Sequence, residues 1–186
     1  MTFANDATQA AAEIGQAVAA IDPAALDALV EEIAEARRIV CHGVGREGLM
    51  MRALAMRLFH MGCDVHVTGD MTCPPLGADD LFLASAGPGM LATVSAFLNV
   101  ARDTGARTAC ITAQPDGATA RLADRLLVIP AQTMANDQGA GASSVLPMGS
   151  LFEGAQFLAF ELLVLRLRER LGVTPEAMRA RHTNLE

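Results

Sequence analysis

The chain has 186 residues, a formal net charge of −7 and 52% apolar residues, with no Trp and no Tyr. Nucleic-acid binding needs a basic surface, so this acidic balance argues against a nucleic-acid partner. All 14 basic residues are Arg, and the absence of Lys excludes a lysine Schiff base and the lysine of a P-loop.

The cysteines and the N-terminal segment indicate where the protein works. Cys41, Cys63, Cys73 and Cys110 form no CxxC motif and no zinc-type spacing with His, which favours a reduced protein without a metal site. Segment 1–20 lacks the basic start of a signal peptide, and the apolar stretch near the C-terminus is interrupted by arginines. We therefore expect a cytoplasmic protein with no membrane association.

The hydrophobic pattern predicts two N-terminal helices and then an alternation of strands and helices. The first helix is expected over Asp6–Ala20, and the second runs from Ile21–Pro23 to about Arg37, with proline at an early helical position. Strands are predicted at Arg38–His42, Asp64–Thr68, Asp80–Ser85, Arg107–Thr112 and Arg125–Ile129. Helices are predicted at about Arg46–Met61, Leu91–Thr104, Ala118–Ala123 and Leu151–Leu171.

This alternation determines the expected fold class. Strands separated by helices of this length predict a parallel sheet covered on both faces. Right-handed crossovers make a three-layer α/β/α sandwich with a five-stranded parallel sheet the default. We expect a single domain over 1–186, with helices in 1–37 and the sandwich plus C-terminal helices in 38–186. The one long aperiodic segment, Thr133–Val145, is typical of a functional loop.

The turn after the first predicted strand is rich in glycine. Gly43–Gly48 (GVGREG) formally satisfies the dinucleotide fingerprint GxGxxG, and Asp64 or Asp70 lies about where a ribose-binding acid is expected. Such glycines also allow a tight turn that exposes helix N-terminal amides to an anion. A small NAD-binding protein is therefore one interpretation. Against it, nothing downstream resembles a separate substrate domain.

Two residues near the C-terminus could carry proton-transfer chemistry. Glu153 lies in the first turn of a helix that is apolar on nearly every face, as in a core or a subunit interface. It is either a helix-start charge or a catalytic base in a poorly hydrated site. His182 is either a titratable catalytic group or a solvated tail residue.

Three blocks of sequence carry a resemblance to a known family. They are Leu54–Gly62 (LAMRLFHMG), Pro147–Glu153 (PMGSLFE) and Arg181–Glu186 (RHTNLE). Together with GVGREG, which is similar to the family's GxGRSG, they closely resemble the 6-phospho-3-hexuloisomerases of the SIS-domain superfamily. The resemblance runs from about Arg38 to Glu186 and implies a SIS, flavodoxin-like fold.

The resemblance also implies a function. It suggests a cofactor-independent aldose–ketose isomerase that acts on a sugar or sugar phosphate through an enediol, with no metal. Glu153 would be the base, and His182 the acid or ring-opening catalyst, in its own or a neighbouring subunit's site. A homo-oligomer, a dimer or tetramer, would have Leu151–Leu171 and the N-terminal helices at its subunit contacts.

The expected ligand-binding residues depart from the family pattern. In the second glycine turn, Ala86-Gly87-Pro88-Gly89 replaces both serines of the family's SGSG, and Glu47 replaces the serine of GRSG. The other candidate binding residues are Gly45, Arg46, Thr112, Ser143 and Ser144. Glu47 is either a favourable acid in the first turn of a helix or a charge that would repel a phosphate. From these departures we expect weakened phosphate recognition. A non-catalytic SIS module that binds a sugar ligand and acts in regulation remains the main alternative.

Overall fold

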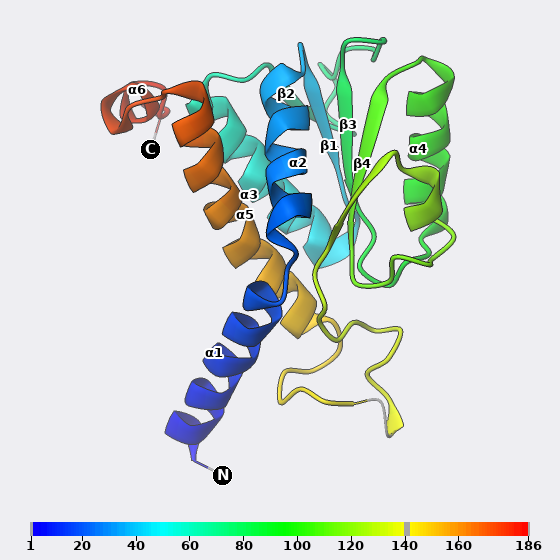
Figure 1. Ribbon diagram of the computed structural model, residues 1–186, viewed down its shortest axis with the longest axis vertical. Helices are drawn as coiled ribbons and strands as arrows, with labels where there is room; N and C mark the ends of the chain where they lie inside the picture. Colours follow the sequence, from blue (N-terminus) through cyan, green and yellow to red (C-terminus); the bar gives the residue numbers. More distant parts are fainter. Residues whose placement is uncertain (1, 140–141, 186) are drawn as a thin grey trace.

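A computed structural model describes residues 2–139 and 142–185. Within these residues, five strands form one parallel sheet in the order β2-β1-β3-β4-β5 (Figure 1). The strands are β1 Ile39–His42, β2 Val65–Val67, β3 Leu81–Ser85, β4 Arg107–Thr112 and β5 Arg125–Val128. This is the strand order of flavodoxin-like, doubly wound folds. The structure therefore confirms the predicted fold class.

Helices cover both faces of the sheet, but unequally. The helices are α1 Phe3–Ala19, α2 Pro23–Glu35, α3 Gly45–Met61, α4 Ala92–Asp103, the 3₁₀ turn η1 Ala120–Leu122, α5 Ser150–Leu171 and α6 Pro175–Ala180. Ile39 and Cys41 pack into the larger core with α2, α3 and α5, whereas Val40 packs into the smaller core with α4. This period-2 alternation along β1 is what a strand between two helical layers requires.

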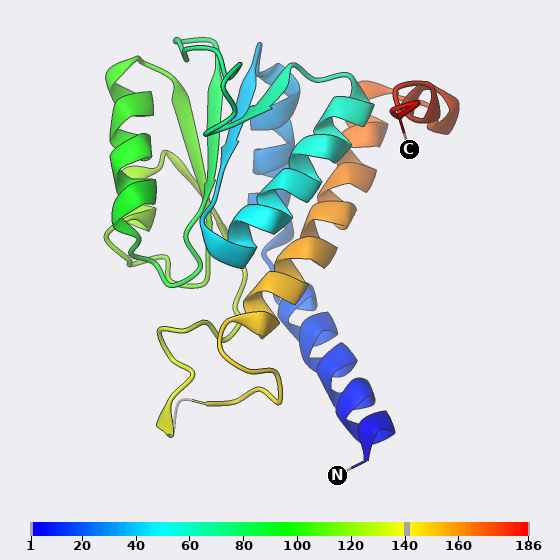
Figure 2. The same cartoon turned by 180° about the vertical axis from the view of Figure 1, so that it is seen from behind.

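The long helix α5 is the centre of the larger layer and lies between α2 and α3 (Figures 1 and 2). Its inner residues, such as Leu163 and Leu167, are fully buried. Helix α1 extends away from the sheet and packs on the N-terminal half of α5. The two helices approach closely at Gly154, where a Cβ would lie 2.9 Å from the Cδ1 of Ile14.

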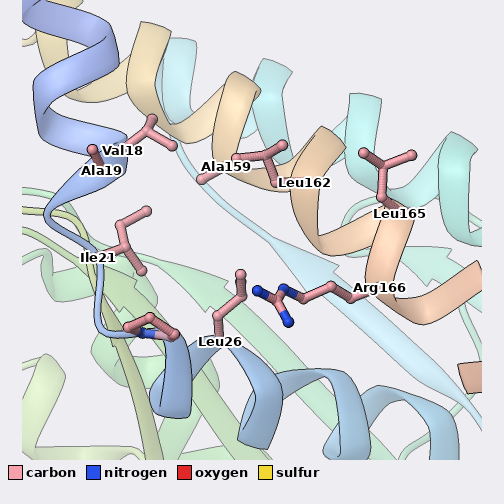
Figure 3. Close-up of a pocket in the computed structure, with 9 residues that line it drawn as sticks. Val18, Ala19, Ile21, Leu26, Ala159, Leu162, Leu165 and Arg166 are labelled. Atoms are coloured by element: carbon pink, nitrogen blue, oxygen red, sulfur yellow. The ribbon is translucent and has the colours of Figure 1, made fainter. Parts of the chain in front are cut away.

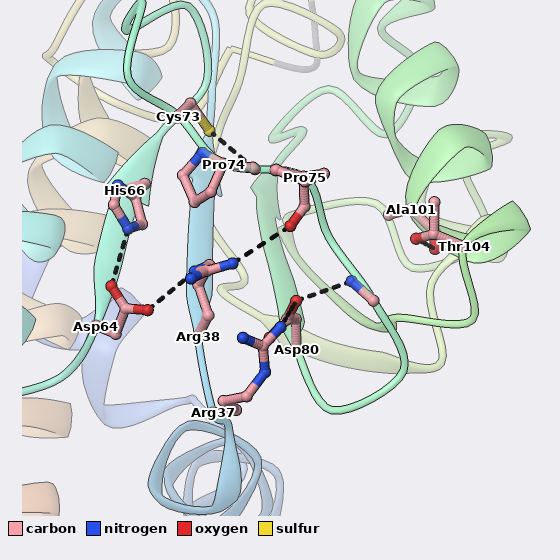
Figure 4. Close-up of polar contacts among 11 residues, drawn as sticks. Arg37, Arg38, Asp64, His66, Cys73, Pro74, Pro75, Asp80, Ala101 and Thr104 are labelled. Atoms are coloured by element: carbon pink, nitrogen blue, oxygen red, sulfur yellow. Dashed lines mark hydrogen bonds and ion pairs between the residues drawn. The ribbon is translucent and has the colours of Figure 1, made fainter.

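The N-terminal edge of the sheet is closed by ion pairs (Figure 4). Arg37 donates to the buried carboxylate of Asp80 at 2.8 Å, and the Gly77 amide donates to the same oxygen at 2.8 Å. Nearby, Arg38 pairs with Asp64 at 2.9 Å. The arginine balances the charge of the buried Asp80 carboxylate, as a buried ionised group requires, whereas Asp80 Oδ1 has no hydrogen-bond partner among the described residues. The glycine turns lie at the opposite edge, together with the start of α5 and the loop before it.

The predicted element bounds differ from the structure in a few places. The first helix begins at Phe3 because Thr2 caps it, and the helix predicted over Ala118–Ala123 is only the short turn η1. A further helix, α6, is capped by Thr174. Residues 140–141 of the expected loop and Glu186 of the C-terminal motif lie outside the described residues. Among the helices that the structure describes, none is long and apolar enough to cross a membrane.

Candidate functional site

A cavity of about 450 Å³ lies at the C-terminal edge of the sheet, where parallel α/β folds bind their ligands. It is bounded by the turn after β1, the turn after β3, the start of α5 and the loop before α5. Its lining residues are Val44, Gly45, Arg46, Glu47, Pro88, Leu91, Met134, Met148, Gly149 and Glu153. Half of them were predicted as site residues from the sequence.

The first glycine turn brings two charged side chains of α3 to this cavity. Gly45 has a φ of +57°, which favours glycine, and a Cβ on Gly48 would lie 2.6 Å from the carbonyl oxygen of Gly43. The turn can therefore close only with glycines at these positions. Its closure places Arg46 and Glu47 in the first turn of α3, beside the cavity.

Arg46 connects α3 to α5. Its guanidinium forms an ion pair with the Glu153 carboxylate, and its Nη2 donates to the Ser150 hydroxyl at 2.9 Å. The Glu153 side chain is only 17% exposed, whereas that of Arg46 is 55% exposed. Glu153 therefore presents a carboxylate that is shielded from bulk water and oriented by a cation. Such a group can act as a base toward a ligand in the cavity.

Glu47 is buried and hydrogen-bonded, rather than being a solvated charge at the helix start. Its Oε2 accepts from the Ser85 hydroxyl at 2.5 Å and from the Gly87 amide at 2.9 Å. The Gln156 amide in turn donates to Ser85 Oγ at 2.9 Å. Burial raises the pKa of Glu47, the two donors oppose that shift, and the charge of Glu153 adds to it.

Ser85 and Gln156 were not predicted as site residues. Two signals in the sequence could have drawn attention to them. Ser85 is a polar residue at the end of an otherwise apolar buried strand, and Gln156 follows Glu153 by three positions on the buried face of α5. Both side chains are completely buried, so each needs a polar partner that the sequence does not identify.

The second glycine turn is closely packed against α5 and β4. A Cβ on Gly87 would lie 2.7 Å from the ring of Phe152, and Gly89 has a φ of +80°. Ala86 is fully buried, and its carbonyl accepts from the Thr112 hydroxyl at 2.8 Å. Thr112 therefore stabilises this turn, because its hydroxyl donates to the backbone.

The loop before α5 contributes methionines rather than serines to the cavity. The amides of Ser143 and Ser144 donate to Gln132 Oε1 at 2.7 and 3.1 Å, and the Ser144 hydroxyl donates to Glu13 at 2.5 Å. These contacts tie the two serines to each other and to α1. Met148, by contrast, lines the cavity and has a φ of 55°, a strained value that clusters at functional sites.

His182 lies far from Glu153 within one chain. It follows α6, and its ring stacks on that of His60 at the end of α3, with centroids 5.3 Å apart. It shares a small cavity with Arg168, which is about 22 Å along α5 from Glu153 at 1.5 Å per residue. Arg181 fixes the tail by donating to the His60 carbonyl at 3.0 Å. A site that uses both groups therefore needs two chains.

Comparisons with known proteins identify the family of the chain. The SIS domain family matches residues 32–157. A 3-hexulose-6-phosphate isomerase of Mycobacterium gastri is 38% identical over 94% of this chain and 86% of the relative. A 3-hexulose-6-phosphate isomerase of Bacillus subtilis is 33% identical over 94% of both chains.

A solved structure shows the same similarity. It is a hypothetical protein of Methanococcus jannaschii, for which a function as 3-hexulose-6-phosphate isomerase was inferred. It superposes with a TM-score of 0.84 at 26% identity, over 98% of this chain and 99% of the other. The chain therefore belongs to the SIS domain family, as an isomerase similar to the 3-hexulose-6-phosphate isomerases.

Proposed function

We propose that this protein is a cofactor-independent sugar isomerase that uses Glu153 as its base. Isomerisation removes a proton from the carbon next to a carbonyl and returns it to the adjacent carbon through an enediol. The observation that carries the proposal is the shielded Glu153 carboxylate at the cavity, held by Arg46. Glu153 takes the proton and then returns it. The exposed guanidinium of Arg46 is available to donate to substrate hydroxyls.

The carbonyl oxygen must gain a proton as the enediol forms, and the oxygen of the neighbouring hydroxyl must lose one as the new carbonyl forms. We assign both transfers to His182 of a neighbouring subunit, which gives the first proton and takes up the second. The proposal requires a homo-oligomer, a dimer or tetramer. Apolar side chains of α5 that remain exposed, such as Phe157 and Leu165, support it, because large exposed apolar areas mark interaction sites. An apolar groove of about 290 Å³ on the same helix is formed with α1 and α2 (Figure 3). Its lining includes Val18, Ala19, Ile21, Leu26, Ala159, Leu162, Leu165 and Arg166.

We further propose that the ligand is a sugar whose phosphate, if present, is bound weakly. The second turn has no hydroxyl at Ala86 or Pro88, and Pro88 has no amide hydrogen. Each lost hydrogen bond to a charged group costs about 1.5–3 kcal/mol, so two losses weaken phosphate binding by roughly a hundredfold or more.

The test of the proposed function is Glu153→Gln, which keeps the shape of the side chain and removes the base. We expect kcat to fall by about 10²–10⁴-fold, the usual contribution of a positioned base. Glu161→Gln is the matched control, since Glu161 lies on the same helix and pairs with Arg57 at 2.9 Å. Normal turnover by Glu153→Gln would make Glu153 a structural charge. Sugar binding without turnover in the wild type would instead favour a non-catalytic module.

Complementation tests the shared site. Glu153→Gln and His182→Ala should each be inactive alone. Mixed oligomers of the two should regain activity, because one of their sites then combines an intact Glu153 with an intact His182. If mixing restores nothing while the mixed oligomers form, the partner's His182 has no part in the site.

A further inference from the structure

We propose that Glu47 is a specificity-determining residue whose carboxylate fills the anion-binding donors of the turn after β3. The site then selects a sugar that presents an uncharged hydroxyl, and not a phosphate, at this position. The inference rests on the proposed function in taking the ligand to be a sugar. Beyond that function, it names the residue that selects the ligand and the part of the ligand that this residue contacts.

The direction of each hydrogen bond around Glu47 supports this role. Gln156 Nε2 can only donate, and it donates to Ser85 Oγ, so the Ser85 hydroxyl hydrogen is left to point at Glu47. The Gly87 amide also can only donate, and it reaches the same carboxylate oxygen. Two donors therefore converge on one oxygen of Glu47. This is the arrangement that binds an oxyanion, and here the protein's own side chain occupies it.

Because Glu47 is buried, a ligand cannot easily displace its carboxylate from these two donors. Glu47 is only 8% exposed, and its Oε1 lies 2.9 Å from the position that a Cβ on Gly87 would take. A phosphate could reach the Gly87 amide only by displacing this carboxylate. Because Oε2 is an acceptor whether or not Oε1 carries a proton, the donors are filled in both protonation states.

The other carboxylate oxygen of Glu47, Oε1, indicates which ligand group the site would bind in place of a phosphate. Oε2 takes both hydrogen bonds, and Oε1 accepts none from residues 2–139 and 142–185. Glu47 also lines the cavity. A carboxylate oxygen at a cavity wall binds a hydroxyl donor and repels an anion. The described lining carries two acids, Glu47 and Glu153, against one base, Arg46, so acidic side chains outnumber basic ones there.

The experiment is a calorimetric titration of wild type, Glu47→Gln and Glu47→Ser with three ligands. These are inorganic phosphate, a hexulose 6-phosphate and the unphosphorylated hexulose. Glu31→Gln is the control, because it removes one negative charge from an exposed pair with Arg170 on α2 and α5. Thermal melts of every variant establish that it is folded.

We expect the wild type to bind the unphosphorylated sugar more tightly than its phosphate. Glu47→Ser should raise affinity for both phosphate ligands by roughly tenfold or more, since it frees the two donors and removes a charge. Glu47→Gln should give a smaller gain in phosphate affinity, because it removes the charge but its side-chain oxygen still accepts from the two donors. Glu31→Gln should leave the affinities for all three ligands unchanged. If Glu47→Ser does not fold, the gain by Glu47→Gln decides the question.

Two outcomes would overturn the proposal. One is tight, preferential binding of the phosphate form by the wild type. The other is the absence of any gain in phosphate affinity in the folded Glu47 variants. The titration does not depend on turnover. If the protein proved not to be an isomerase, the binding result for Glu47 would therefore still stand. If the binding proposal for Glu47 failed, Glu153 would remain the proposed base.

Discussion

Ser85→Ala should destabilise the protein substantially, and the loss should depend on pH. Ser85 is fully buried, and its hydroxyl links the amide of Gln156 to the carboxylate of Glu47. The substitution removes one hydrogen bond to a carboxylate, which contributes about 1.5–3 kcal/mol, and leaves a buried amide hydrogen without its acceptor. We expect a total loss of about 2–4 kcal/mol at neutral pH. A chain of this size loses roughly 2–4 °C in Tm per kcal/mol.

The pH dependence follows from the pKa of Glu47, which burial raises above 4.5 in the folded protein. A group with a raised folded pKa binds more protons folded than unfolded, so stability falls as pH rises from about 4.5 through the folded pKa. The Ser85 hydroxyl lowers that pKa, and its removal raises it further. The destabilisation by Ser85→Ala should therefore be smallest below pH 4.5 and grow toward neutral pH.

The assay is urea unfolding at several pH values from acid to neutral, with Ser95→Ala as the control. Ser95 is a partly buried serine that shares a 2.7 Å hydrogen bond with the Thr119 hydroxyl, with no carboxylate in the pair. Its loss should cost about 0.5–1.5 kcal/mol, independent of pH. If Ser85→Ala costs no more than Ser95→Ala, or costs the same at every pH, the buried network does not hold Glu47 as described.

Three further predictions concern packing, reactivity and the tail. Gly87→Ala should cost about 1–3 kcal/mol by denaturant unfolding, because its Cβ would lie 2.7 Å from the Phe152 ring; an unchanged midpoint would contradict this packing. Burial raises the pKa of Cys41 and Cys110 to about 12, so both should resist iodoacetamide until the protein is unfolded, as mass spectrometry of the labelled peptides can show. Removal of 182–186 should abolish turnover with little change in Tm; a large drop in Tm would make the tail structural.

Much of the fold could be predicted from the sequence because its signals are local. The runs that became β1 and β3 are short, apolar and fully buried, and glycine turns or helices separate them. The turn chemistry also agrees with the structure, since Gly45 and Gly89 have the positive φ values that tight turns need. The differences lie in element bounds, chiefly where a cap or a 3₁₀ turn decides the end, and in the short helix α6, for which no range was predicted.

The site could be predicted only in part because its key contacts are not local. A carboxylate at position 47 suggested either a helix-start charge or a repulsive neighbour of phosphate. Its true environment depends on Ser85, which lies 38 positions away in the sequence, and on Gln156, still further along the chain. No periodicity encodes such a contact. The proposed role of His182 is harder still to predict, since it would depend on how one chain contacts another.

The central claim is that Glu153 moves the proton, and solvent exchange tests it most directly. Proton NMR in D₂O can follow a hexulose and its 6-phosphate with wild type, Glu153→Gln and Glu161→Gln. We predict deuterium incorporation at the carbon next to the carbonyl with wild type and Glu161→Gln, and none above background with Glu153→Gln. Exchange by Glu153→Gln at the wild-type rate, or no exchange of either sugar by the wild type, would contradict the account.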